Sequence, residues 1–220
     1  MKKNNNFLKL ISLNSTDSTN GYAFRLAEEG QDEIVVVRAN SQTSGRGRRQ
    51  NTWDSPANAG IYVSFLLRPS NSLADLIWLP LLFSYASALT LAPMIKTTIK
   101  WPNDIVTSGK KIGGVLVEAR SQSRRIEFAI AGIGLNVNSE KNDIPKAATS
   151  LYLETKEKYD IDEVFQALTT NIINIYKEFK TGNIKRLLKE ILDFIPQSED
   201  FNKFVEKYSK EDIRSVLILR

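Results

Sequence analysis

Residues 41–53 read SQTSGRGRRQNTW and are the most informative stretch of this chain. It contains two glycines and three arginines, and no aliphatic side chain anchors it. Glycine adopts backbone conformations closed to other residues, and arginine offers a fixed fork of donors to carboxylate or phosphate oxygens. We therefore expect a loop that binds a small anion, hereafter the arginine segment. A solvated basic turn and a nucleic-acid patch are the alternatives.

A β-branched run leads directly into the arginine segment and predicts a buried strand at residues 34–39. Further strands are expected at residues 61–67, 97–101, 105–107, 114–119, 126–132 and 135–138, and a lone one at 216–219. Helices are expected at residues 20–29, 75–91, 160–182 and 184–194. Because strands come first and helices later, the order predicts an α+β fold: a mixed sheet with helices packed mainly on one face.

The composition limits the number of domains and excludes several kinds of site. The chain has 220 residues and 42% of them are hydrophobic, which suits one domain with a real core. It has no cysteine and no histidine, so disulfides, thiolate or imidazole metal sites and Cys–His or Ser–His nucleophiles are excluded. The net charge of +5 suits an acidic partner, but the 25 acidic residues are mixed with the basic ones and no basic strip stands out.

No stretch of the sequence predicts a signal peptide or a membrane span. Lys9 interrupts the apolar residues near the start, which argues against a signal peptide. The longest apolar stretch, residues 79–95, contains two prolines and is too short for a membrane span. We expect a cytoplasmic protein.

Four more motifs accompany the arginine segment: DSTN at residues 17–20, KWPND at 100–104, KKIGGVLVE at 110–118 and GIGLN at 132–136. In content and order, the five motifs resemble those of the biotin protein ligases. The resemblance spans residues 12–138, and an ordered set is far more specific than any single motif.

The resemblance implies a two-step reaction. Biotin and ATP give biotinyl-5′-AMP and pyrophosphate, and the biotinyl group then passes to a lysine of a biotin carboxyl carrier protein domain of a biotin-dependent carboxylase. Magnesium is expected with the ATP. The biotin carboxylate itself attacks the α-phosphorus, so the enzyme has to align two anions and neutralise their repulsion. The missing histidine and cysteine are therefore compatible with this chemistry.

The resemblance also assigns residues. Those implied for biotin are neutral polar groups for its ureido ring, with glycines and cations that close over it: Ser18, Thr19, Asn20, Gln42, Gly45, Arg46, Gly47, Arg48, Lys111 and Gly114. Those implied for ATP are Arg46, Arg48, Arg49, Trp53, Lys100, Asn103 and Asn136. Arg48, Lys111 and Asp104 are the expected catalytic residues, and Asp104 is the expected ligand of Mg²⁺ or the group that orients the incoming lysine.

Several of these residues have simpler explanations that stay open. Ser18 or Thr19 suits the cap of the following helix. Lys100 suits a surface charge at the end of a strand, and Trp53 a core side chain instead of a platform for adenine.

The chain departs from the family pattern at two places. Gln50 and Asn51 stand where the family commonly has Gly-Arg, and the hypothesis is weaker retention of the adenylate. An intermediate lifetime equal to that of relatives with the extra arginine would refute it. We expect a catalytic domain at residues 1–195 and a short tail at 196–220 in place of the usual small β-barrel domain. No DNA-binding segment is expected before DSTN, so a repressor role is not expected.

Three other functions remain open: a biotin-binding sensor or inactive relative, a lipoate or octanoate ligase-like enzyme, and a nucleic-acid binder. The first would release no pyrophosphate on addition of biotin. The last predicts salt-sensitive binding that biotin does not affect. We expect no specific nucleic-acid partner, and a homodimer is left open.

Overall fold

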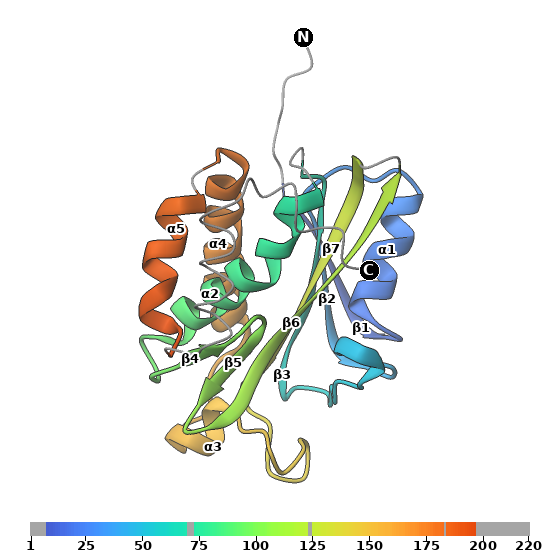
Figure 1. Cartoon of the computed structure of the whole chain (residues 1–220). Helices are drawn as coiled ribbons and strands as arrows, with labels where there is room; N and C mark the ends of the chain where they lie inside the picture. The colour runs from blue at the N-terminus through green and yellow to red at the C-terminus, as the bar shows by residue number, and fades with distance from the viewer. Residues whose placement is uncertain (1–7, 70–72, 123–124, 183, 197–220) are drawn as a thin grey trace.

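The computed structural model describes residues 8–69, 73–122, 125–182 and 184–196, which build one seven-stranded sheet (Figure 1). Its strand order is β1-β2-β3-β7-β6-β5-β4. β1 and β2 are parallel and all other neighbours are antiparallel, so the sheet is mixed, as expected. The strands are β1 (Lys9–Thr16), β2 (Val35–Gln42), β3 (Gly60–Leu67), β4 (Thr98–Lys100), β5 (Asp104–Thr107), β6 (Lys110–Gln122) and β7 (Arg125–Asn136).

Most helices lie on one face of the sheet: α2, α4 and α5 cover that face, whereas α1 covers the other (Figure 1). The α+β prediction is therefore confirmed, with α1 as the helix on the second face. The helices are α1 (Thr19–Glu28), α2 (Leu79–Leu91), α3 (Leu151–Thr155), α4 (Ile161–Lys180) and α5 (Ile184–Ile191), with 3₁₀ turns η1 (Arg48–Gln50), η2 (Leu73–Trp78) and η3 (Leu192–Phe194).

Burial of β2 on both faces of the sheet explains why its sequence is a continuous apolar run. Val36 belongs to the larger core beneath α2 and α4, whereas Val35 and Val37 belong to the smaller core beneath α1. Successive side chains of a strand point to opposite faces, so a strand covered on both faces needs apolar residues at every position. β3 beside it is buried along its whole length. The arginine segment thus begins at the end of a strand that is covered on both faces.

The helix expected from residue 160 is confirmed as α4. Its predicted apolar stripe is buried throughout: Val164, Phe165, Leu168, Ile172, Ile175, Tyr176 and Phe179. The Asp160 carboxylate caps the first turn by accepting from two backbone N–H groups. Gly182, at φ 82°, follows the last turn. α4 packs against α2, and the two helices form most of the layer on that face.

The structure corrects several expected boundaries. β1 and α3 were not expected. Residues 126–132 and 135–138 were expected as two segments, but they belong to one strand, β7, that ends at Asn136. Residues 73–78 form a 3₁₀ turn, so α2 begins at Leu79 instead of residue 75. Pro80 in its first turn is a residue that favours a helix start.

The expected C-terminal tail, residues 196–220, and the lone strand at 216–219 lie outside the described residues apart from Pro196. In the ranges that the structure describes, no helix combines the length and apolarity needed to cross a bilayer.

Candidate active site

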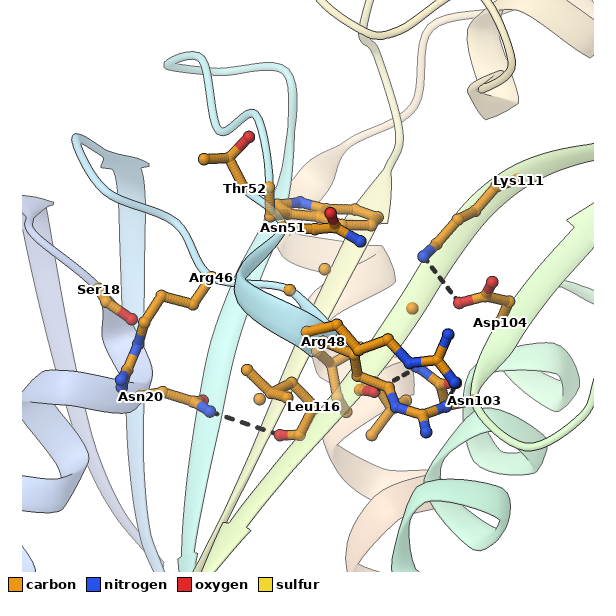
Figure 2. A pocket seen from close by; sticks show the side chains of 18 of the residues that line it. Ser18, Asn20, Arg46, Arg48, Asn51, Thr52, Asn103, Asp104, Lys111 and Leu116 are labelled. Atoms are coloured by element: carbon orange, nitrogen blue, oxygen red, sulfur yellow. Dashed lines mark hydrogen bonds and ion pairs between the residues drawn. The ribbon is translucent and has the colours of Figure 1, made fainter.

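A cavity of about 380 Å³ opens where the N-terminus of α1, the arginine segment, the β5–β6 hairpin and β7 meet (Figure 2). Most of the residues predicted for the site line it: Ser18, Thr19, Asn20, Gln42, Arg46, Gly47, Arg48, Arg49, Trp53, Asn103, Asp104, Lys111 and Gly114. Gly45, Lys100 and Asn136 are not among its lining residues. The structure therefore brings together segments that are up to about a hundred positions apart in the sequence.

One end of the cavity is neutral and polar. Thr19 donates to the Gln42 Oε1 atom twice, from its backbone N at 2.8 Å and from Oγ1 at 3.1 Å. Gln42 Nε2 in turn donates to Ser55 Oγ at 2.8 Å. Ser18 caps α1, as the simpler explanation had it, because its Oγ accepts from Gly21 N at 3.4 Å, and it also lines the cavity. These bonds hold the amide and hydroxyl groups in fixed orientations before any ligand enters.

Ser64, in the middle of β3, is a buried member of this end that sequence reasoning missed. Its Oγ lies 2.6 Å from Asn20 Oδ1 and 2.8 Å from Thr19 Oγ1, and it is completely buried. One hydroxyl carries one hydrogen, so it donates to only one of these acceptors at a time. A serine among apolar residues of a strand was the available signal. Its pairing with α1 could not be read without the strand order.

Two glycines of the GIGLN motif make room for side chains of the site. A methyl group on Gly132 would lie 2.1 Å from Asn20 Oδ1, and one on Gly134 would lie 2.4 Å from Trp53 Cε2. Neither position can carry a side chain unless its neighbour moves. Sequence reasoning assigned only Asn136 of this motif, so the contribution of the two glycines was missed.

The other end of the cavity is cationic. Arg48 Nη1 donates to Asn103 Oδ1 at 2.7 Å, and Lys111 Nζ lies 2.7 Å from Asp104 Oδ1 (Figure 2). Asn103 is itself buried and fixed by donating from Nδ2 to the carbonyl of Val115 at 2.9 Å. Arg48 and Lys111, from segments 63 positions apart, thus line one hollow. Asp104 is the one carboxylate among the residues that line it.

Trp53 lies between this cavity and a second one of about 330 Å³. Lys111 Nζ lies 5.3 Å from the centre of a Trp53 ring, and the buried indole Nε1 has no hydrogen-bond partner. The second cavity shares Trp53, Lys111, Asn51 and Thr52 with the first and is otherwise lined by Asp54, Asn136, Ile144, Pro145 and Ala148. A flat group lying against the indole would contact both cavities.

The remaining predicted residues have distinct positions. Gly45 is buried, and a methyl group there would lie 2.3 Å from the Trp53 carbonyl oxygen, so this glycine lets the backbone at Trp53 come close. Asn136 is buried and donates to the Thr149 carbonyl at 2.9 Å. Lys100 is exposed at the end of β4, as its surface-charge explanation had it, and its contact with a nucleotide stays a prediction.

Arg46 points away from the cationic end. Its guanidinium lies beside Asn20, and Nη2 is 3.0 Å from the Glu118 carboxylate (Figure 2 shows Arg46 and Asn20). Glu118 belongs to the KKIGGVLVE motif but had been assigned no role. This position does not support the contact between Arg46 and ATP, which stays a prediction. Arg49 lines the cavity and has a left-handed backbone, with φ 54°.

The comparisons with known proteins agree on one family. Residues 12–138 match the family model described as the biotin/lipoate A/B protein ligase family. The bifunctional ligase/repressor BirA of Bacillus subtilis is 37% identical over 178 residues, which cover 78% of this chain and 55% of that protein. The biotin–[acetyl-CoA-carboxylase] ligase of Mycobacterium tuberculosis is 35% identical over 143 residues, which cover 62% of this chain and 52% of that protein. The chain thus spans about half the length of these curated relatives.

Among solved structures, the biotin protein ligase from Aquifex aeolicus in complex with biotin and ATP matches with a TM-score of 0.72. It is 33% identical, and the match covers 85% of this chain and 78% of that one.

Proposed function

Because the chain belongs to the biotin/lipoate A/B protein ligase family, we propose that it activates biotin with ATP and transfers the biotinyl group to a lysine of a biotin carboxyl carrier protein domain. The observation that carries the proposal is one cavity with a neutral polar end and a cationic end, in which Arg48 and Lys111 lie together. The biotin ligases among the relatives support biotin over lipoate as the substrate.

The neutral end suits the ureido ring of biotin. A planar, uncharged head with donors and acceptors needs neutral polar partners held in place, and Ser18, Thr19 and Gln42 supply them. Their existing hydrogen bonds fix the side chains before the ligand arrives, so binding costs little further ordering.

The cationic end suits the two reacting anions. In the first step, a carboxylate oxygen of biotin forms a bond to the α-phosphorus, and the bond to pyrophosphate breaks. Arg48 and Lys111 lower the repulsion between the carboxylate and the phosphate and stabilise the charge that builds on the phosphate oxygens. In the second step, the carrier lysine attacks the acyl carbon and AMP leaves. Asp104, in the same cavity, orients that amine.

The second cavity suits the nucleotide base. Adenine would lie against the Trp53 indole, with Asn136 and Asn51 at hand as polar partners. Asn51 is the position at which the family commonly has arginine, so one cation is missing from this wall and we expect weaker retention of the adenylate.

The donor set fits a magnesium ion that takes most of its ligands from the nucleotide. Among the described residues, no group of three or more carboxylate, histidine or cysteine side chains could hold a metal by itself. Mg²⁺ is often held by one or two carboxylates together with substrate phosphates, and Asp104 is the carboxylate that lines the first cavity, beside Arg48 and Lys111. The ion would neutralise phosphate charge when bound.

The proposal is tested by incubating the full chain with ATP, Mg²⁺, biotin and a carrier domain, followed by intact mass of the carrier. We expect the carrier to gain one biotinyl group, and none when biotin or ATP is omitted. A parallel reaction with lipoate and its own carrier domain tests the other branch of the family. A chain that binds biotin but never modifies a carrier or releases pyrophosphate would be a sensor, and the proposal would be wrong.

A further inference from the structure

Glu118, in the middle of β6, connects two walls of the cavity although its own side chain is not among the lining residues. Its Oε2 atom accepts from Asn20 Nδ2 at 2.7 Å and lies 3.0 Å from Arg46 Nη2. Asn20 belongs to α1 and Arg46 to the arginine segment, and both side chains line the cavity. One carboxylate oxygen therefore joins the helix to the loop.

The contact continues through the neutral end of the cavity. Asn20 is held from its other side by Ser64, which neighbours Thr19, and Thr19 donates to Gln42. Gln42 then donates to Ser55, whose Oγ donates to the Trp53 carbonyl oxygen at 3.1 Å. The series of contacts thus starts at Arg46 and returns to the arginine segment at Gln42 and, through Ser55, at Trp53.

In this series of contacts, Glu118 is the residue that holds the exposed Arg46 side chain in place. The Arg46 side chain is 45% exposed, and Glu118, at 30%, is its ion-pair partner. Asn20, by contrast, is buried and has Ser64 and the Leu116 carbonyl as further partners. Loss of the carboxylate charge therefore leaves Asn20 with its other partners, whereas Arg46 loses its ion pair and no longer holds the arginine segment.

We infer that Glu118 is a positioning residue that holds the arginine segment closed over the neutral end of the cavity, and so slows the escape of a ligand bound there. This inference rests on the proposed function, with biotin as the ligand. Glu118 touches no reacting group, so its effect is on binding and not on the chemical steps.

The test measures the dissociation constant of biotin by calorimetry for the full chain and for Glu118→Gln. The glutamine keeps an oxygen for Asn20 and removes the charge that pairs with Arg46. We expect the dissociation constant and the KM for biotin to rise about tenfold, with kcat at saturating biotin within about twofold of the parent, because an interaction lost equally from the ground state and the transition state raises KM and leaves kcat unchanged.

Glu127→Gln is the matched control. Glu127 lies on the neighbouring strand β7, and its ion pair with Arg120 has a similar distance, 3.1 Å, and similar exposure, 35% and 50%. It lines neither cavity, and its variant should bind biotin as the parent does.

Arg46→Gln and the double variant Glu118→Gln/Arg46→Gln complete a double-mutant cycle, so the test does not depend on one substitution. If the pair is the cause, the double variant loses no more affinity than the weaker-binding single variant. Equal biotin affinity of Glu118→Gln and the parent overturns the inference, as do fully additive losses in the cycle. A parent chain that binds no biotin overturns the proposed function instead, so the two failures are distinguishable.

Discussion

At the scale of single residues, the site depends on positions where a side chain is absent as much as on those where one is present. Gly134 faces the Trp53 indole, and Gly132 faces the Asn20 amide, at distances that exclude even a methyl group. Both glycines lie in β7, whose buried side chains are apolar apart from Asn136. The motif GIGLN is therefore explained by the two side chains that lie over it.

Gly134→Ala should displace the Trp53 indole and reduce adenylate formation. Because a displacement of about 1 Å in a positioned group can cost about 10²-fold in rate, we expect a loss of that order in kcat/KM for ATP. Pyrophosphate release measures it. Gly21→Ala is the control, since a methyl group there meets its nearest neighbours at 3.6 Å, an ordinary contact. Equal activity of both variants would contradict the assigned role of Gly134.

The side chains of the site could be predicted from the sequence, but their partners could not. Arg48 and Lys111 were both assigned to the site, and both line one cavity. The partners of Ser64 and Glu118 could not be read from the local sequence, because they lie more than forty positions away. Only the pairing of β3, β6 and β7 brings those neighbours together.

At the scale of elements, helices were predictable where capping and periodicity agree. α4 has an acidic cap and an unbroken apolar stripe, and both are local properties of the chain. β1 was missed because it is an edge strand whose side chains are mostly exposed or half-buried, so it lacks the apolar run that marked β2. β7 was expected as two segments because its glycines, Gly132 and Gly134, resemble turn signals, whereas they make room for Asn20 and Trp53.

Asp160→Ala should destabilise α4 without affecting the active site. The carboxylate accepts from Asp162 N at 2.7 Å and Glu163 N at 3.3 Å, and loss of such a cap typically costs about 1 kcal/mol. Chemical denaturation measures the change in unfolding free energy, and biotin affinity should stay as in the parent. Glu157→Ala, an exposed acid just before the helix, should leave stability unchanged. Equal stability of the two variants would show that the cap contributes nothing.

At the scale of the whole molecule, Glu33, just before β2, connects α4 to the sheet. Its carboxylate accepts from Tyr176 Oη at 2.8 Å and from Arg68 N at 2.9 Å, and it also pairs with Lys180. Burial alone would raise the pKa of Glu33, but these three hydrogen bonds outweigh it and lower the pKa below its ordinary value of 4.5. Burial also raises the pKa of the Tyr176 hydroxyl well above its usual range, so it stays a donor.

The stability of the fold should therefore depend on Glu33 in acid. A carboxyl with a lowered pKa in the folded state stabilises it above pH 4.5, and this contribution is lost as the pH falls further. Glu33→Gln should lower the unfolding free energy at pH 7 and make the difference from the parent shrink toward pH 3. Denaturation at a series of pH values measures it. A difference that is constant across this range would contradict the assigned pKa direction.

The sheet order was the part of the fold that the sequence could not supply. Strand pairing such as β3 with β7 joins segments about seventy positions apart, and nothing in either segment specifies the other. The cavity exists only because this order places α1, the arginine segment and the β5–β6 hairpin around β7.

The central claim is that Arg48 and Lys111 together hold biotin and ATP for reaction, and biotin-dependent exchange of labelled pyrophosphate into ATP tests it most directly. The parent chain should exchange label only when biotin is present. Arg48→Ala and Lys111→Ala should each lower the exchange rate by about 10²–10³, the usual effect of removing one such donor. Exchange that does not need biotin, or variants that exchange as fast as the parent, would contradict the account.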